Sequence, residues 1–139
     1  MSSVFTKIIQ GDLPGYFVWK DDTCVSFLSI NPVSPGHALI VPIMEIDHWL
    51  DLPDDVNSHL MQVAQVIGIA QMAAFNPSRI GMLIAGFEVP HTHLHVIPMQ
   101  GMSDLDLSLA AKTVDHDHLA GNAEKLRSAI TNNGYTSGV

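Results

Sequence analysis

Cysteine and basic residues are both scarce in this chain of 139 residues. Cys24 is the only cysteine, so an intrachain disulfide and a cysteine-based zinc ribbon are excluded. Six basic residues stand against fourteen acidic ones, for a formal net charge of -8. So few cations argue against binding to a nucleic-acid polymer. A small phosphorylated ligand is still compatible with this charge, because imidazoles and backbone N–H groups bind phosphate locally.

Long hydrophobic runs are also missing. No apolar stretch approaches the ~20 residues of a membrane-spanning helix, and the first residues lack the basic-then-apolar pattern of a signal peptide. We therefore expect a cytoplasmic protein with no membrane partner. Hydrophobic residues make up 47% of the sequence, which indicates a folded globule, and the length suits one domain.

Local patterns predict an α+β fold with a largely antiparallel sheet of four or five strands. Short β-branched or apolar runs between turn residues predict the strands, and one segment near each end of the chain has a helical pattern. The expected strands are residues 16–20, 23–29, 37–41, 80–85 and 89–98, and the short helical segments are 4–10 and 122–131.

The one long helix expected is residues 53–75, which Asn76 and Pro77 end. Its apolar residues are not confined to one stripe. One stripe is Leu60, Val63, Ala64, Ile67, Ala70 and Ala74; the second face carries Met61, Val66, Ile69, Met72 and Ala73. A helix that is apolar on two faces is either deeply buried or shared with a second subunit, and in so small a chain we favour a homodimer through this helix.

The sequence's most informative feature is a row of alternating histidines, His91, His93 and His95. In a strand, alternation sends these three side chains to one face and the residues between them to the other. The intervening residues are Thr92, Leu94 and Val96, which suit a packed core. A further histidine, His37, is expected to approach from an adjacent strand.

Three interpretations of the histidine row compete. The histidines are incidental surface residues, they bind a metal, or they carry phosphate chemistry with a histidine nucleophile. The clear core pattern of the opposite face argues against the first interpretation. No Asp, Glu or Cys stands nearby at ligand-like spacing, which argues against the second, so we predict no metal site. Phosphate chemistry is the favoured interpretation.

The segment His91-Thr-His93-Leu-His95-Val-Ile resembles the His-x-His-x-His-hydrophobic-hydrophobic signature of the histidine triad (HIT) family, and its bacterial Hint-like branch in particular. Further blocks follow in that family's order and spacing: residues 4–9, 13–14, 21–22, 27–32 and 35–42. The resemblance implies a five-stranded, mainly antiparallel sheet with one long helix and one or two short ones. It covers residues 4 to about 100, so we expect a HIT domain over residues 1–110 and a partly helical or loosely ordered C-terminal segment over residues 111–139.

The resemblance also implies roles for individual residues. His93 would attack the α-phosphorus of a nucleotide and become a nucleotidyl-histidine, while His91, His95 and His37 would orient it, relay protons and hold phosphate oxygens. Backbone amides near Glu88 and Val89 would contact the phosphate. An apolar slot for the base would be formed by Phe5, Ile8, Leu13, Phe27, Ile30 and Leu39, with Ser29 at the ribose hydroxyls. No cofactor is implied, and the family is normally a homodimer.

Three departures from the family pattern bear on substrate and rate. Ser29 stands where a carboxylate usually accepts hydrogen bonds from the ribose, and Phe87 stands where glutamine is common. Thr6 replaces one of two cysteines that zinc-binding members need, so we predict no structural zinc. The expected function is a hydrolase or transferase that acts on a nucleoside phosphate ester, amidate or anhydride, with a purine nucleoside monophosphate derivative as substrate. The alternatives are a catalytically weak nucleotide-binding or regulatory module and a small histidine-based metal-binding protein.

Overall fold

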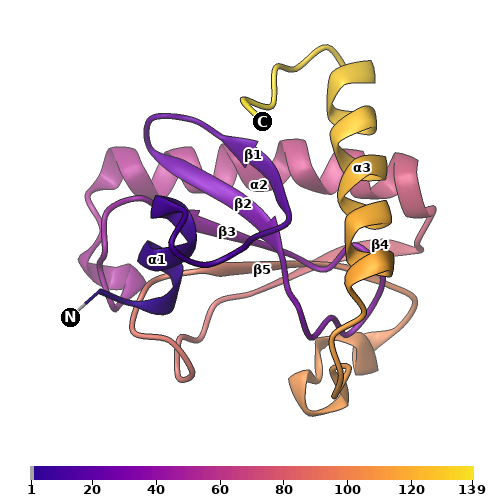
Figure 1. The fold of residues 1–139 in the computed structure, drawn as a ribbon, viewed down its shortest axis with the longest axis horizontal. Helices are drawn as coiled ribbons and strands as arrows, with labels where there is room; N and C mark the ends of the chain where they lie inside the picture. The colour runs from indigo at the N-terminus through magenta and orange to yellow at the C-terminus, as the bar shows by residue number, and fades with distance from the viewer. Residues whose placement is uncertain (1) are drawn as a thin grey trace.

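A computed structural model describes residues 2–139 and contains one five-stranded sheet in the order β1-β2-β3-β5-β4 (Figure 1). Every pair of neighbouring strands is antiparallel, which confirms the predicted α+β class. The strands are β1 (Phe17–Lys20), β2 (Cys24–Leu28), β3 (Ala38–Pro42), β4 (Arg79–Leu83) and β5 (Leu94–Met99). The helices are α1 (Val4–Gln10), α2 (Asp54–Phe75) and α3 (His116–Asn132), with short 3-10 turns η1 (Trp49–Asp51), η2 (Met102–Leu105) and η3 (Leu107–Leu109).

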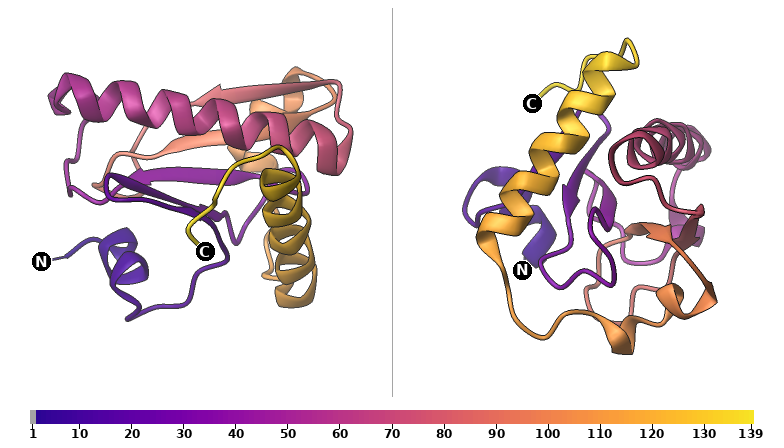
Figure 2. Two further views of the ribbon diagram at one scale, coloured as in Figure 1. Left: turned by 90° about the horizontal axis from the view of Figure 1, so that it is seen from above. Right: turned by 90° about the vertical axis from the view of Figure 1, so that its right-hand side faces the viewer.

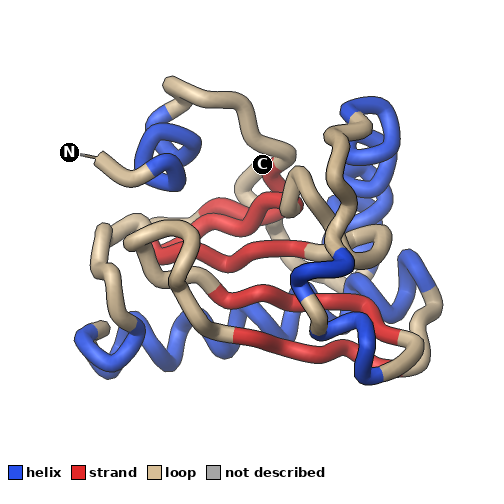
Figure 3. Tube along the Cα trace, turned by 90° about the horizontal axis from the view of Figure 1, so that it is seen from below, coloured by secondary structure: helices blue, strands red, loops and turns tan. Residues whose placement is uncertain are grey.

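The sheet separates two hydrophobic clusters. Figures 2 and 3 show α1 and α2 on opposite sides of the sheet. Alternation along β3 sends Ala38 and Ile40 to the cluster beneath α2, and Leu39 and Val41 to the smaller cluster beneath α1. The second cluster is shared with Phe5 of α1. The candidate site therefore has a core layer behind it and one short helix in front of it.

Only the last histidine of the row, His95, lies within a strand. The sequence predicted a strand over residues 89–98, but β5 begins only at Leu94, so His91 and His93 precede it. The chain there bends, and the backbone N–H of Thr92 donates to the carbonyl of Ile46 instead of joining the sheet. The prediction of opposite faces survives in part, because Leu94 still packs into the core beneath α2.

One buried side chain links α2 to β5 and to the residues that lead into β3. Gln71, with no exposed surface, donates through Nε2 to the carbonyls of Gly36 and Val96, both at 2.9 Å. Gly36 itself has a φ of 87° and lies against Phe75, where a Cβ atom would overlap the ring. Helix α2 can therefore approach the start of β3 closely. Gly36 is followed directly by His37, so this close contact helps to position that histidine.

The C-terminal segment is more regular than the sequence suggested. The predicted helix covered residues 122–131, whereas α3 begins at His116, where the side chain of Asp115 caps its first turn. Its apolar side packs against α2 and β1, in the same cluster as the α2 core; the buried members are Leu119, Ala123, Leu126, Ala129 and Ile130. Within residues 2–139, no helix has the length and apolarity to cross a membrane.

Candidate active site

A cavity of about 500 Å³ opens on the α1 side of the sheet and collects most of the sequence-predicted site residues. Three of the four histidines, His37, His93 and His95, contribute to its lining. All of the residues predicted for nucleotide binding also line it: Phe5, Ile8, Leu13, Phe27, Ser29, Ile30, Leu39, Glu88 and Val89. His91 and Phe87 are not among the lining residues, and Phe87 is 96% exposed.

The ring of His93 is held in one tautomer. Its Nδ1 lies 2.8 Å from the carbonyl oxygen of His91, and because a carbonyl only accepts hydrogen bonds, Nδ1 carries the proton. The other nitrogen, Nε2, is therefore left with its lone pair. The edge of the ring packs against Phe5, with 4.8 Å between ring centroids, and the residue is almost fully buried. His93 is thus oriented as a nucleophile would need to be.

A chain of hydrogen bonds sets the tautomers of the neighbouring pair. The backbone N–H of Val33 donates to His37 Nδ1 at 3.2 Å, so the proton of that ring is on Nε2. His37 Nε2 in turn lies 2.9 Å from His95 Nδ1 and donates to it. The proton of His95 is then on Nε2, on the side away from His37. One backbone amide therefore determines which atom of His95 donates.

Both rings of this pair stay neutral at physiological pH. Burial lowers the pKa of His37 to about 3, with a further contribution from the nearby His95. Burial likewise lowers the pKa of His95 to about 4, together with the proximity of His93, and the carboxylate of Glu88 opposes the shift. Because neither ring is charged, the tautomer chain holds across the physiological range.

His95 Nε2 is a donor held ready for a ligand. It is buried and has no hydrogen-bond partner among residues 2–139. The rings of His93 and His95 stand 5.0 Å apart between centroids, roughly edge to face. A nucleophilic lone pair and an N–H donor therefore lie side by side at the polar end of an otherwise apolar cavity. That pair can attack an electrophilic phosphorus and stabilise an oxygen on it.

His91 anchors the backbone behind the nucleophile. Its Nε2 donates to the carbonyl of Pro42 at 2.7 Å, so its Nδ1 accepts from the hydroxyl of Ser3, also at 2.7 Å. Ser3 and Thr6 both donate to one carboxylate oxygen of Glu45. The hydrogen bonds from the Thr6 hydroxyl and the Ser3 backbone lower the pKa of Glu45 to about 2. This network joins α1 to the segment whose carbonyl orients His93.

The prediction that no carboxylate lies near the histidines is wrong, because Glu88 is close to two of them. The sequence showed no carboxylate at ligand-like spacing from the histidines, yet Glu88 offers an oxygen that lies within 4.8 Å of ring nitrogens of His93 and His95. The loop before the histidine row folds back over it, which linear spacing does not reveal. The residues present could hold a metal ion, and they equally surround the space expected for a phosphate.

The C-terminal segment supplies a part of the cavity wall that was not predicted from the sequence. Four lining residues come from the stretch between η3 and the start of α3: Leu107, Ala110, Val114 and His116. The hydroxyl of Tyr16 is hydrogen-bonded to His116 Nδ1, which ties the start of α3 to the cavity mouth. No local pattern in residues 101–121 marks these side chains as site residues, because their placement depends on where α3 docks.

Comparison with known proteins finds relatives in the family that the histidine row resembles. A family model described as HIT domain matches residues 10–102. An uncharacterized HIT-like protein of Borreliella burgdorferi is 38% identical over 103 residues, covering 68% of this chain and 73% of the relative. Adenosine 5'-monophosphoramidase HNT1 of Saccharomyces cerevisiae is 31% identical over 118 residues, covering 84% and 75%. 

A solved structure shows the same fold. The crystal structure of a Hit-like protein from Bartonella henselae matches with a TM-score of 0.80 at 28% identity, covering 92% of this chain and 96% of that one. The fold, the ordered histidine row and the family model confirm the resemblance seen in the sequence. This chain belongs to the histidine triad (HIT) family.

Proposed function

We propose that the protein hydrolyses or transfers nucleoside monophosphate groups through a covalent intermediate on His93. The observation that carries the proposal is the pairing of two fixed atoms at one end of the cavity. His93 Nε2 has its lone pair free because Nδ1 donates to the His91 carbonyl, and His95 Nε2–H stands beside it without a protein partner among the described residues.

The chemistry follows from those two atoms. In the first step a bond forms between His93 Nε2 and the α-phosphorus, and the bond from phosphorus to the leaving group breaks. The leaving amine or alcohol departs with a proton from solvent, while His95 Nε2–H donates a hydrogen bond to a phosphoryl oxygen. In the second step water attacks the same phosphorus, the bond to His93 breaks, and the proton of the water goes to solvent.

The rest of the cavity supports a nucleoside. Its lining is largely aromatic and aliphatic, which suits a flat heterocyclic base. Ser29 lines the same cavity at the position expected for the ribose, and its Oγ accepts from the backbone N–H of Asn31. The yeast relative is named an adenosine 5'-monophosphoramidase, so we propose a purine nucleoside 5'-phosphoramidate as the first substrate to test.

Intact-protein mass spectrometry tests the covalent step. The wild type is mixed briefly with adenosine 5'-monophosphoramidate, quenched, and weighed. The expected result is an added mass of one adenylyl group, mapped to His93 by peptide fragmentation and absent from a His93→Ala variant. Two results together contradict the proposal: the wild type turns over substrate without an adduct at the shortest times, and the His93→Ala variant keeps full activity.

A second candidate function is nucleotide binding with slow or no turnover. Ser29 offers the ribose a neutral hydroxyl instead of a carboxylate, and Phe87 points into solvent, so neither supplies the polar contact that the family pattern would place there. Single-turnover kinetics with the same phosphoramidate separates the candidates. Elemental analysis of purified protein checks the remaining alternative, a metal held by Glu88, His93 and His95.

We also propose a homodimer through α2 and the edge strand β4. Met61, Ile69 and Met72 are between 41% and 54% exposed on the outer side of α2. They line a groove that continues over β4, which ends the sheet and leaves one side of its backbone unpaired. A second copy laid across a two-fold axis would cover this apolar surface. A cytoplasmic location stays a prediction.

A further inference from the structure

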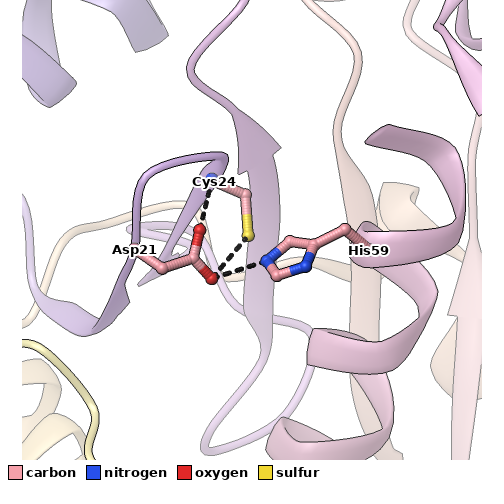
Figure 4. A group of neighbouring side chains, drawn as sticks. All are labelled: Asp21, Cys24 and His59. Carbon is pink, nitrogen blue, oxygen red and sulfur yellow. Dashed lines mark hydrogen bonds and ion pairs between the residues drawn. The ribbon is translucent and has the colours of Figure 1, made fainter. Parts of the chain in front are cut away.

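A second cluster of reactive side chains lies away from the histidine triad, on the α2 side of the sheet. Asp21 comes from the turn that joins β1 to β2, Cys24 is the first residue of β2, and His59 comes from the second turn of α2 (Figure 4). Asp21 Oδ2 lies 2.7 Å from His59 Nε2 and 3.8 Å from Cys24 Sγ. The three ligand atoms all lie within 4.8 Å of one another.

The turn holds the carboxylate in place from behind. The backbone N–H groups of Thr23 and Cys24 both donate to Asp21 Oδ1 at 2.8 Å, and the N–H of Asp21 donates to the carbonyl of Cys24. Oδ2 accepts from the indole of Trp19 and faces the other two members. Burial opposes ionisation of Asp21, but the hydrogen bonds from Trp19, His59 and the turn outweigh it and lower its pKa to about 2.

We propose that Asp21, Cys24 and His59 form a binding site for a zinc-class divalent cation. Carboxylate oxygen, thiolate and imidazole are the three ligand types that zinc uses in proteins. With metal–ligand distances of about 2.0 to 2.3 Å, tetrahedral ligands lie roughly 3.3 to 3.6 Å apart. The distance from Asp21 Oδ2 to His59 Nε2 is shorter than that range, and the distance from Oδ2 to Cys24 Sγ is slightly longer. A small rotation of the His59 ring therefore opens space for the ion.

The surroundings of the cluster also fit a three-ligand site with one open position. Cys24 is completely buried, while the side chains of Asp21 and His59 are 24% and 35% exposed. Solvent therefore reaches the cluster through Asp21 and His59, where a water would complete the tetrahedron. The hydrogen bonds behind Asp21 Oδ1 are the outer contacts that fix the orientation of a metal ligand. A bound cation would clip the β1–β2 turn to α2.

Binding at this site is coupled to proton release. The Cys24 thiol must lose its proton to solvent as the sulfur–metal bond forms, and His59 must present an unprotonated Nε2. Burial raises the pKa of the Cys24 thiol, with a further contribution from the charge of Asp21. Because a metal ion must displace the thiol proton to bind the sulfur, the affinity is expected to rise with pH.

Cobalt(II) is the probe that isolates this site, because Cys24 is the only thiol in the chain. Metal-free protein is titrated with cobalt at pH 7 and pH 8, and the sulfur-to-cobalt charge-transfer band in the near ultraviolet is recorded. The expected result is a saturable band at one equivalent, stronger binding at pH 8, and displacement by zinc. A His93→Ala variant, whose triad cluster is disabled, should keep the band.

Two variants and one control decide the ligand set. Cys24→Ser should lose the band, and His59→Gln, a change at a part-exposed side chain, should weaken cobalt binding more than about tenfold. His118→Gln, on the exposed side of α3, should bind as the wild type does. Absence of a band in wild-type protein at excess cobalt, or unchanged affinity in a folded His59→Gln, overturns the proposal and leaves Asp21 as a hydrogen-bond acceptor only.

Discussion

The reactivity proposed for His93 depends on a single carbonyl group. In many histidine-based sites a carboxylate orients the ring, but here the acceptor of the Nδ1 proton is the backbone oxygen of His91, two residues earlier. The side chain of His91 then fixes that oxygen by bonding to Ser3 and Pro42. Because this acceptor holds the Nδ1 proton, the lone pair of Nε2 is the one that faces the cavity as a nucleophile.

Replacing His93 by Ala should abolish turnover while leaving folding and nucleotide binding largely intact. The covalent nucleophile is removed, so the rate should fall on the order of 10³-fold or more. Steady-state hydrolysis of the phosphoramidate and calorimetry with adenosine monophosphate measure the two effects separately. Near wild-type activity in this variant means that the covalent mechanism is wrong.

Replacing Ser29 by Asp should strengthen binding of adenosine or guanosine monophosphate. A charged acceptor at the ribose hydroxyls makes stronger hydrogen bonds than a hydroxyl does, and the gain can reach about 1–2 kcal/mol before repulsion from the phosphate is subtracted. Calorimetry on the two proteins gives the difference directly. Equal or weaker affinity would place the ribose elsewhere in the cavity.

Acid should destabilise the fold through the His37–His95 pair. Unfolded histidine has a pKa of about 6.5, whereas the folded values are about 3 and about 4. Between pH 6.5 and 4 the unfolded chain therefore binds protons that the native chain does not, and the free energy of unfolding decreases as the pH falls. The slope approaches about 1.4 kcal/mol per pH unit for each histidine.

Urea denaturation across this pH window, with His37→Gln as the test variant, checks the assignment. The variant should lose about one proton's worth of the slope. His118→Gln, a change at an exposed position of α3, is the control for the removal of a histidine. A His37→Gln protein whose stability falls with pH as steeply as the wild type would show that His37 is not the group that titrates.

At the scale of elements, the triad is held where β3 and β5 meet, on the face of the sheet opposite α2. The pairing of these strands places Leu39 opposite His95, so the histidines of the two strands lie next to one another at the strand ends. Gln71 reaches from α2 to a carbonyl on each side of that pairing. The position of the donor pair is therefore set partly from the far face of the sheet.

Replacing Gln71 by Leu should destabilise the protein and slow the reaction. The change leaves the carbonyls of Gly36 and Val96 buried without their side-chain partner, which costs about 1–3 kcal/mol for an unsatisfied group. The thermal midpoint and the phosphoramidase rate are to be measured together, with Gln62→Leu, at an exposed position of α2 outside the groove, as a control for the loss of an amide. If the two variants have the same stability, the Gln71 contacts do not support the strands.

Sequence patterns predicted the elements well where one face is buried locally. The apolar alternation of residues 37–41 and the two-faced helix both correspond to observed elements, because each pattern reflects contacts within a single strand or helix. The late start of β5 was not predictable, since the carbonyl of Ile46 competes for the Thr92 amide and lies far away in sequence. Glu88 and His116 reach the cavity through loop and helix docking, which spacing does not encode.

At the scale of the whole molecule, the outer surface of α2 is the feature that the single chain leaves incomplete. The inner side of this helix is buried by the sheet and α3, and the outer side keeps three large apolar residues exposed. The edge strand β4 lies next to it and contributes to the same groove. Both features suit self-association across a two-fold axis.

Light scattering at micromolar concentration should report a dimer, and Ile69→Lys or Met61→Glu should convert it to a monomer. A charge placed in the apolar interface would be buried without a partner, which strongly disfavours association. The exposed residue Leu50, on the short turn before α2, offers a matched Leu50→Lys control that should remain dimeric. A wild-type monomer at this concentration contradicts the proposed interface.

Because the C-terminal segment lines part of the cavity, the residues that shape the binding space and the residues that react come from different parts of the chain. The atoms proposed to react belong to His93 and His95, whereas Leu107, Val114 and His116 line the same cavity from a later part of the chain. None of these three is hydrogen-bonded to His93 or His95. Changes in the tail can therefore alter which base fits while leaving the reacting atoms untouched. Divergence among relatives in this segment would then retune substrate preference without rebuilding the chemistry.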